Sequence, residues 1–178
     1  MSTPAAPARL IPPAFTATMQ IGIVVPDLDA AIERYEKDFG IGPWQRHQFQ
    51  PGEVKEWRER GRAVEGGAKT RFAAAMVGTT QWELIEPLDD HGIFAEFLAR
   101  TGGTGGVHHI AVKATNYDAL LSAEATRGQP PRPLAMECEL GGQYEGIKVA
   151  YLDTQRDLGV LLEVFSGLPE GEPKGAKG

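Results

Sequence analysis

The stretch QIGIVVPDLDAAI at residues 20–32 decides the fold, because it recurs without a gap as HIAVKATNYDALL at residues 109–121. Each copy is typical of a short apolar strand, a turn with a helix-capping residue, and the start of an amphipathic helix. A second pair of segments closes the copies, since QWELI at residues 81–85 resembles LLEVF at residues 161–165. The chain therefore contains a duplicated unit.

The composition fits one compact domain, or two small modules that share a core. The chain has 178 residues, a net charge of −6 and one cysteine, Cys138. This charge gives no reason to expect binding to nucleic acid or to an anionic membrane, and no apolar run approaches the roughly 20 residues of a membrane span. A single cysteine excludes an intramolecular disulfide, and the first residues lack the layout of a signal peptide. We expect a cytoplasmic protein.

The order of the predicted elements indicates an α+β fold, in which two paired βαβββ modules form a curved, half-barrel mixed sheet with helices outside. We expect a flexible lead-in at 1–17 and the first module with a connecting helix at 18–101. A glycine-rich linker at 102–106 separates it from the second module at 107–166, and a disordered tail follows at 167–178.

An apolar stripe in the first module predicts a helix that Asp27 caps and Gly40 ends. The stripe consists of Leu28, Ala31, Ile32, Tyr35 and Phe39. The other predicted elements are strands at 70–77 and 81–86, a short helix around 93–98, a strand at 107–114, a helix at 116–126 stopped by Gly128, a proline-rich loop at 129–133, and strands near 134–140, 146–152 and 159–165.

Residues 53–71 carry many charges of both signs. Their arginines and lysines suggest an anion site, such as one for coenzyme A, but glutamates balance them, so we expect a solvated surface loop. The indoles of Trp44 and Trp57 fit either pocket lining or ordinary packing.

Strand alternation decides which side chains share a surface, because successive residues point to opposite faces. The apolar neighbours of Gln20, Glu83, His109 and Glu163 take the helix-covered face, which places these four polar residues on the concave face of the sheet. The same rule places His108 on the opposite side, against the core. Burying two carboxylates without a cation costs about several kcal/mol each. A divalent metal bound by this repeat-related set explains the pattern with the fewest assumptions.

These motifs resemble those of the vicinal oxygen chelate superfamily, also called the glyoxalase/bleomycin-resistance/dioxygenase group. The likeness covers residues 18–166 and is greatest to methylmalonyl-CoA epimerases, in the segments VGTTQWELIEPL at 77–88, GVHHIAV at 106–112 and LLEV at 161–164. The resemblance implies that Gln20, Glu83, His109 and Glu163 hold a divalent cation. Epimerases usually have His where this chain has Gln20, and the resulting ligand set is more similar to that of glyoxalase I lyases.

Three oxygen donors and one imidazole suit Zn, Co, Ni, Mn, Mg or Fe(II). Such a cation can chelate two neighbouring oxygens of a small substrate, such as an acyl-CoA, and stabilise the enolate that forms when a proton next to a carbonyl is removed. We therefore expect a metal-dependent epimerase or isomerase, with Glu163 as the base and Glu83 as its counterpart across the metal.

Three other functions occur in the same superfamily and are alternatives for this chain. A glyoxalase I-type lyase acting on a thiol adduct needs the same ligands, and a non-catalytic small-molecule binding protein would need no metal. An extradiol dioxygenase needs two His ligands, and only one His occupies a ligand position here. The open edges of two half-barrels favour pairing across a two-fold axis, so we also expect a homodimer.

Overall fold

The structure, a computed structural model, describes residues 13–49, 53–65, 67–126 and 133–168. Most of the predicted lead-in, most of the tail, Gly128 and most of the proline-rich loop lie outside the described residues. The strands are β1 (Phe15–Val24), β2 (Gln45–His47), β3 (Val54–Glu59), β4 (Arg62–Ala63), β5 (Thr70–Val77), β6 (Thr80–Pro87), β7 (Gly106–Ala114), β8 (Met136–Leu140), β9 (Lys148–Leu152) and β10 (Leu161–Ser166). The helices are α1 (Leu28–Phe39), α2 (Gly92–Arg100), α3 (Tyr117–Thr126) and α4 (Gln155–Leu158), with a short 3₁₀ turn at Gly142–Tyr144.

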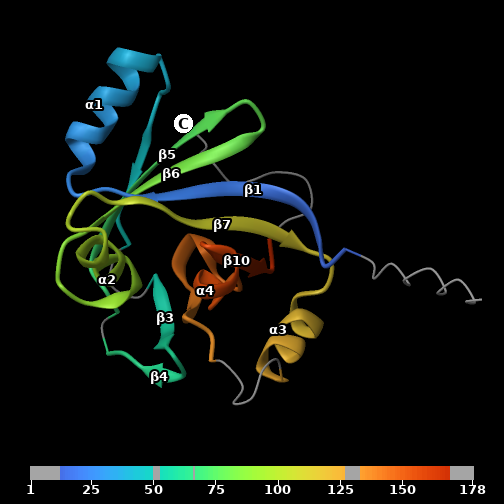
Figure 1. The fold of residues 1–178 in the computed structure, drawn as a ribbon. Coiled ribbons are helices and arrows are strands. Elements are labelled where there is room, and N and C mark those ends of the chain that lie inside the picture. Colours follow the sequence, from blue (N-terminus) through green and yellow to red (C-terminus); the bar gives the residue numbers. More distant parts are fainter. Residues whose placement is uncertain (1–12, 50–52, 66, 127–132, 169–178) are drawn as a thin grey trace, which may run out of the picture.

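Ten strands form one open, mixed sheet in the order β2-β5-β6-β1-β7-β10-β9-β8-β3-β4. The first module contributes β2-β5-β6-β1 and the second β7-β10-β9-β8, and the two meet where β1 pairs with β7 in antiparallel fashion. Within each module the first and last strands, β1 with β6 and β7 with β10, run parallel. Figure 1 shows β1 and β7 crossing the middle of the molecule, with α1 and α3 on either side. The predicted α+β fold is confirmed.

Helix α1 packs on the outer face of the first module. Leu28 and Ile32 are buried together with Trp44 and Leu84, which shows that Trp44 serves packing, and its indole N–H donates to the Ile41 carbonyl at 2.8 Å. Phe39 departs from the predicted stripe, because this last helical residue is 63% exposed.

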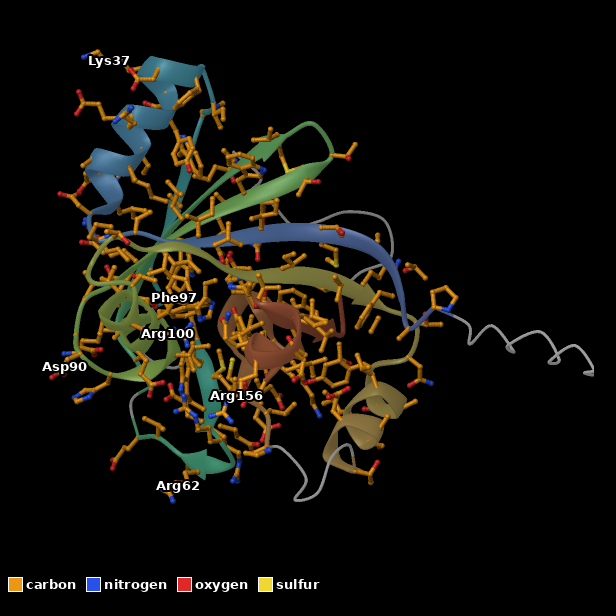
Figure 2. All side chains as sticks on the ribbon, viewed as in Figure 1. Lys37, Arg62, Asp90, Phe97, Arg100 and Arg156 are labelled. Atoms are coloured by element: carbon orange, nitrogen blue, oxygen red, sulfur yellow. The ribbon has the colours of Figure 1, made fainter. Side chains whose placement is uncertain are left out.

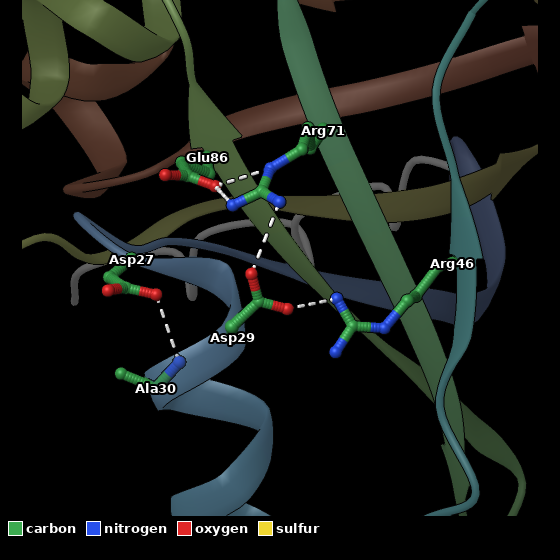
Figure 3. A network of polar contacts seen from close by, with 6 residues as sticks. All are labelled: Asp27, Asp29, Ala30, Arg46, Arg71 and Glu86. Carbon is green, nitrogen blue, oxygen red and sulfur yellow. Dashed lines mark hydrogen bonds and ion pairs between the residues drawn. The ribbon is translucent and has the colours of Figure 1, made fainter.

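A polar network ties the start of α1 to the sheet (Figure 3). The Asp27 carboxylate caps the helix by accepting from the Ala30 backbone N–H at 3.0 Å. Asp29 then pairs with Arg46 of β2 and, at 3.2 Å, with Arg71 of β5. Since Arg71 also pairs with Glu86 of β6, one aspartate and two arginines link the helix to three strands.

The inner face of the sheet holds the largest apolar cluster. Helix α2 inserts Ile93, Phe94 and Phe97 against Tyr151 and Leu161 of the second module. Helix α3 covers a smaller cluster on the outer face of that module, around Leu120 and Val164. None of the described helices combines the length and the apolar composition needed to cross a membrane.

The charged segment 53–71 differs from the predicted solvated loop. Strands β3 and β4 form a hairpin, and β3 pairs with β8, so part of the first module's sequence extends the sheet of the second. Trp57 packs against the inner cluster, while Lys55 faces outward and pairs with Glu145 at 2.8 Å. Strand β3 was not predicted because the charged residues on its exposed outer face resemble those of a surface loop.

One predicted boundary needs correction, and one strand of the first module was not located in the sequence. β1 begins at Phe15, so its first residues lie in what was expected to be the flexible lead-in. The second strand of the first module is β2, a three-residue strand with no sequence signal of its own. In the 102–106 segment, all four glycines have positive φ between 66° and 135°, which few other residues adopt.

Candidate functional site

His109 lies at the centre of the inner face, beside the seam between the modules. It sits on β7 opposite Gly22 of β1 and is fully buried. A Cβ atom at position 22 would come within 1.9 Å of the His109 ring carbon Cε1. The glycine therefore makes room for the imidazole.

Glu163 reaches the same place from β10. Its carboxylate Oε2 lies 3.2 Å from His109 Nε2, and its side chain is only 5% exposed. Both atoms are buried, and neither has a hydrogen-bond partner. Two unsatisfied polar atoms that face each other in a core are costly, so their arrangement calls for a third group between them.

The first module brings Glu83 and Gln20 to the same hollow. Glu83 Oε2 lies 3.8 Å from His109 Nε2, with 19% of the side chain exposed. The Gln20 amide donates to Gln81 Oε1 at 2.7 Å. The structure thus collects all four predicted residues on one face, although no three His, Cys, Asp or Glu side chains among the described residues are arranged to hold a metal ion as they stand.

The local electrostatics favour uncommon protonation states. Burial, followed by the negative charge of Glu163, raises the pKa of Glu83 from 4.5 to about 7, although His109 and a hydrogen bond from Gln20 act in the opposite direction. Burial lowers the pKa of His109, but the charges of Glu163 and Glu83 outweigh it and leave that pKa raised. At neutral pH the Glu83 carboxyl can therefore both hold and release a proton.

Tyr151 of β9 is a site residue that sequence reasoning missed. Its ring contacts the His109 ring at 5.0 Å between centroids. Burial, the charges of Glu163 and Glu83, and a hydrogen bond with Glu163 raise the pKa of Tyr151 well above 10, so the phenol keeps its proton. Tyr151 pairs with Glu163 across β9 and β10; alignment of these two predicted strands would have been the signal.

His108 is the second missed residue, and its predicted placement on the opposite face is wrong. A β-bulge interrupts the pairing of β1 with β7, because Gly22 pairs with His109 while Ile23 pairs with Val107. His108 is the extra residue, and its Nδ1 lies 3.1 Å from His109 Nδ1. Burial, together with the positive charges nearby, lowers the pKa of His108 to about 2.

Behind His108 lies a cavity of about 60 Å³, lined in part by Arg60, Glu96, Phe97 and Arg100. Arg60 pairs with Glu96, and the Arg100 guanidinium lies 5.1 Å from the centre of the Phe97 ring; Figure 2 labels this last pair on α2. The cavity's lining mixes both charges and gives no preference for an anion.

A curved sheet of paired βαβββ modules, with a His and carboxylates converging at the seam, defines a class of proteins. Residues 19–151 match the Glyoxalase/Bleomycin resistance protein/Dioxygenase superfamily, and the chain belongs to this family. No protein with a curated description matches the sequence.

Several solved structures share the fold. Methylmalonyl-CoA epimerase from Mycobacterium tuberculosis is 21% identical, with a TM-score of 0.60, over 92% of this chain and 95% of that one. A variant of the methylmalonyl-CoA epimerase from Streptomyces coelicolor, in complex with 2-nitronate-propionyl-CoA, is 24% identical, with a TM-score of 0.57, over 85% and 96%. A methylmalonyl-CoA epimerase in complex with methylmalonyl-CoA and NH4+ is 23% identical, with a TM-score of 0.60, over 89% and 99%. These likenesses concern the fold.

Proposed function

We propose that this protein is a metal-dependent epimerase or isomerase that removes a proton from the carbon next to a carbonyl group. The observation that carries this proposal is the buried pair of His109 Nε2 and Glu163 Oε2, 3.2 Å apart and without hydrogen-bond partners. Methylmalonyl-CoA is the first substrate to test, because one of the proteins with this fold binds it.

The residues fit a divalent cation by their chemistry. Two orphaned atoms of different type, one imidazole nitrogen and one carboxylate oxygen, face each other. A second carboxylate, that of Glu83, lies 3.8 Å from the imidazole, and Gln20, whose side chain hydrogen-bonds with Glu83, carries an amide oxygen that could complete the set. Such a set of one nitrogen and three oxygens suits several divalent metals. When bound, the cation would act as a Lewis acid on the substrate's oxygens.

The two carboxylates have different environments and therefore suit different roles. Glu163, held by the phenol of Tyr151, is the proposed base that takes the proton from the substrate carbon. Glu83, whose pKa is raised to about 7, is the proposed donor that returns a proton from the other module's side. An acid and a base on opposite sides of one carbon invert its configuration.

Aromatic side chains shield the site from water. Phe94 of α2 lies 6.3 Å from the His109 ring and 6.0 Å from the Tyr151 ring between centroids, and Phe72 of β5 packs on Phe94. Excluding water strengthens the electrostatic interactions in the site.

Deuterium exchange tests the proposal. Methylmalonyl-CoA and simpler acyl-CoA thioesters are incubated with metal-loaded protein in deuterated water, and label at the alpha carbon is followed by NMR. We expect rapid exchange with wild type and a loss of roughly 100-fold or more with Glu163→Gln. Glu83→Gln, which removes the proposed proton donor, should also slow exchange. Glu86→Gln is its matched control and should not, because Glu86 lies on the outer face of the same strand and pairs with Arg71. Absence of label with every thioester would contradict the proposal.

The alternative candidate function is that of a lyase of the glyoxalase I type. The observation in its favour is Gln20, whose amide stands where His is usual in epimerases. In the same assay, conversion of a hemithioacetal without label in any acyl-CoA would support the lyase. Ligand binding without conversion of either substrate class would support a non-catalytic binding protein.

A further inference from the structure

The bulge at His108 changes what this residue can do. A regular strand would send consecutive side chains to opposite faces, but the extra residue in β7 turns both histidine rings toward the inner side. The rings stand at 88° with centroids 5.4 Å apart, and their Nδ1 atoms are 3.1 Å apart. Bulges often redirect a side chain next to a functional site.

The His108 ring is held rigidly on its other sides. It is 2% exposed and lies between Phe94 and Phe97 of α2, with ring centroids at 4.9 and 5.1 Å. A hydrogen bond to the backbone of Ile93, at the start of the same helix, also reaches the ring. Because that bond favours the protonated ring, a ring N–H donates to the Ile93 carbonyl.

Counting hydrogens then sets both tautomers. A neutral imidazole has one N–H and one acceptor nitrogen. If the His108 Nε2–H donates to Ile93, its Nδ1 must accept, and the donor at 3.1 Å is the Nδ1–H of His109. The His109 Nε2 lone pair is then left toward Glu163 and Glu83, as a metal ligand requires.

We propose that His108 is a positioning residue that holds His109 in the Nδ1–H tautomer and in the ring orientation needed for Nε2 to bind a metal. The inference rests on the proposed metal site, but the tautomer and ring orientation of His109 can be measured in the metal-free protein. It also gives the double histidine a reason: the second residue binds, and the first orients it.

Two measurements test the inference. Long-range ¹H–¹⁵N NMR of metal-free protein, recorded at a pH above the raised pKa of His109 so that the ring is neutral, reports its tautomer, and competition titration with Zn²⁺ reports affinity. We expect the Nδ1–H tautomer in wild type. In His108→Phe we expect a mixture of tautomers and roughly 10- to 100-fold weaker Zn²⁺ binding. His108→Gln should stay within about three-fold of wild type, because its amide can accept from His109 and donate to Ile93.

A packing control separates orientation from stability. Phe97→Leu loosens the same ring contact but keeps both His108 nitrogens, so it should lower the melting temperature and weaken Zn²⁺ binding much less than His108→Phe does. An Nε2–H tautomer in wild type would overturn the inference, even if His108→Phe does not fold. Unchanged Zn²⁺ affinity in a folded His108→Phe would overturn it as well. Wild type with the Nδ1–H tautomer but no Zn²⁺ binding would refute the metal site alone and leave the orienting role supported.

Discussion

The two modules are repeats of one unit, but their contributions to the site differ in burial. The second module supplies His109 and Glu163, which are 0% and 5% exposed and are backed by His108 and Tyr151. The first supplies Glu83, at 19% exposure, and Gln20, whose amide donates to a neighbouring glutamine. The second module therefore supplies the more deeply buried side of the site, and the first module supplies the more exposed side.

The same asymmetry appears at the repeat-equivalent pair Gly22 and Ala111. The second module tolerates a methyl group at this position, whereas the first needs glycine because the partner module's imidazole fills the space. We predict that Gly22→Ala destabilises the protein by about 3 kcal/mol and abolishes metal binding. Ala111→Gly should cost only about 1 kcal/mol. Urea unfolding and Zn²⁺ titration measure both, and a Gly22→Ala protein that binds metal normally would break the comparison.

The duplicated fold and the four converging residues could be predicted because repetition and strand alternation are visible in the sequence itself. It could not predict the bulge at His108, which changes alternation without altering composition, nor the pairing of β3 with β8, which depends on contacts between distant segments. Tyr151 was missed for a related reason: its role comes from register with Glu163 on the next strand.

A second prediction concerns pH in the chelated, metal-free protein. The pKa of Glu83 is raised from 4.5 to about 7, so between these values the folded chain binds more protons than the unfolded chain. The free energy of unfolding should therefore fall as pH rises through this window, by roughly 3 kcal/mol from this group. The raised pKa of His109 acts in the same direction, since its contribution is lost as pH rises above its unfolded value.

Glu83→Gln should remove the Glu83 part of this dependence. The variant should match wild type near pH 4.5 and exceed it in stability at pH 8, as measured by urea unfolding across pH. Glu86→Gln, on the outer face of the same strand, should show no such gain. Parallel pH profiles for wild type and Glu83→Gln would contradict a raised pKa for Glu83.

A third prediction compares ion pairs in the two regions. Arg71 bridges Glu86 and Asp29 while 33% exposed. The Lys55–Glu145 pair, which links β3 to the segment between β8 and β9, is 45% and 62% exposed. We expect Arg71→Met to lower the melting temperature measurably, because Arg71 holds two carboxylates at once, and Lys55→Met to leave it almost unchanged, because an isolated exposed pair contributes little. Thermal unfolding at low and high salt measures both, and equal losses would argue against the difference.

A fourth prediction, that the chain forms a homodimer, concerns assembly and has the smallest expected effect on the site. The outermost strands, β2 and β4, have three and two residues, and such short edges leave little backbone to pair. The two-fold contact should therefore use side chains rather than edge pairing. Light scattering at micromolar concentration should give about twice the 19.2 kDa of the chain, and a mass of one chain would refute the dimer.

The central claim is that one divalent metal binds at the seam, anchored by the second module. Competition titration with Zn²⁺, with metal content checked by elemental analysis, tests this most directly. The account predicts one ion per chain in wild type. It predicts losses of affinity of about 100-fold or more for His109→Ala and Glu163→Gln, against about 10-fold for Gln20→Ala and Glu83→Gln. Wild-type protein that stays metal-free after Zn²⁺ and Co²⁺ are supplied, or equal losses for all four variants, would contradict it.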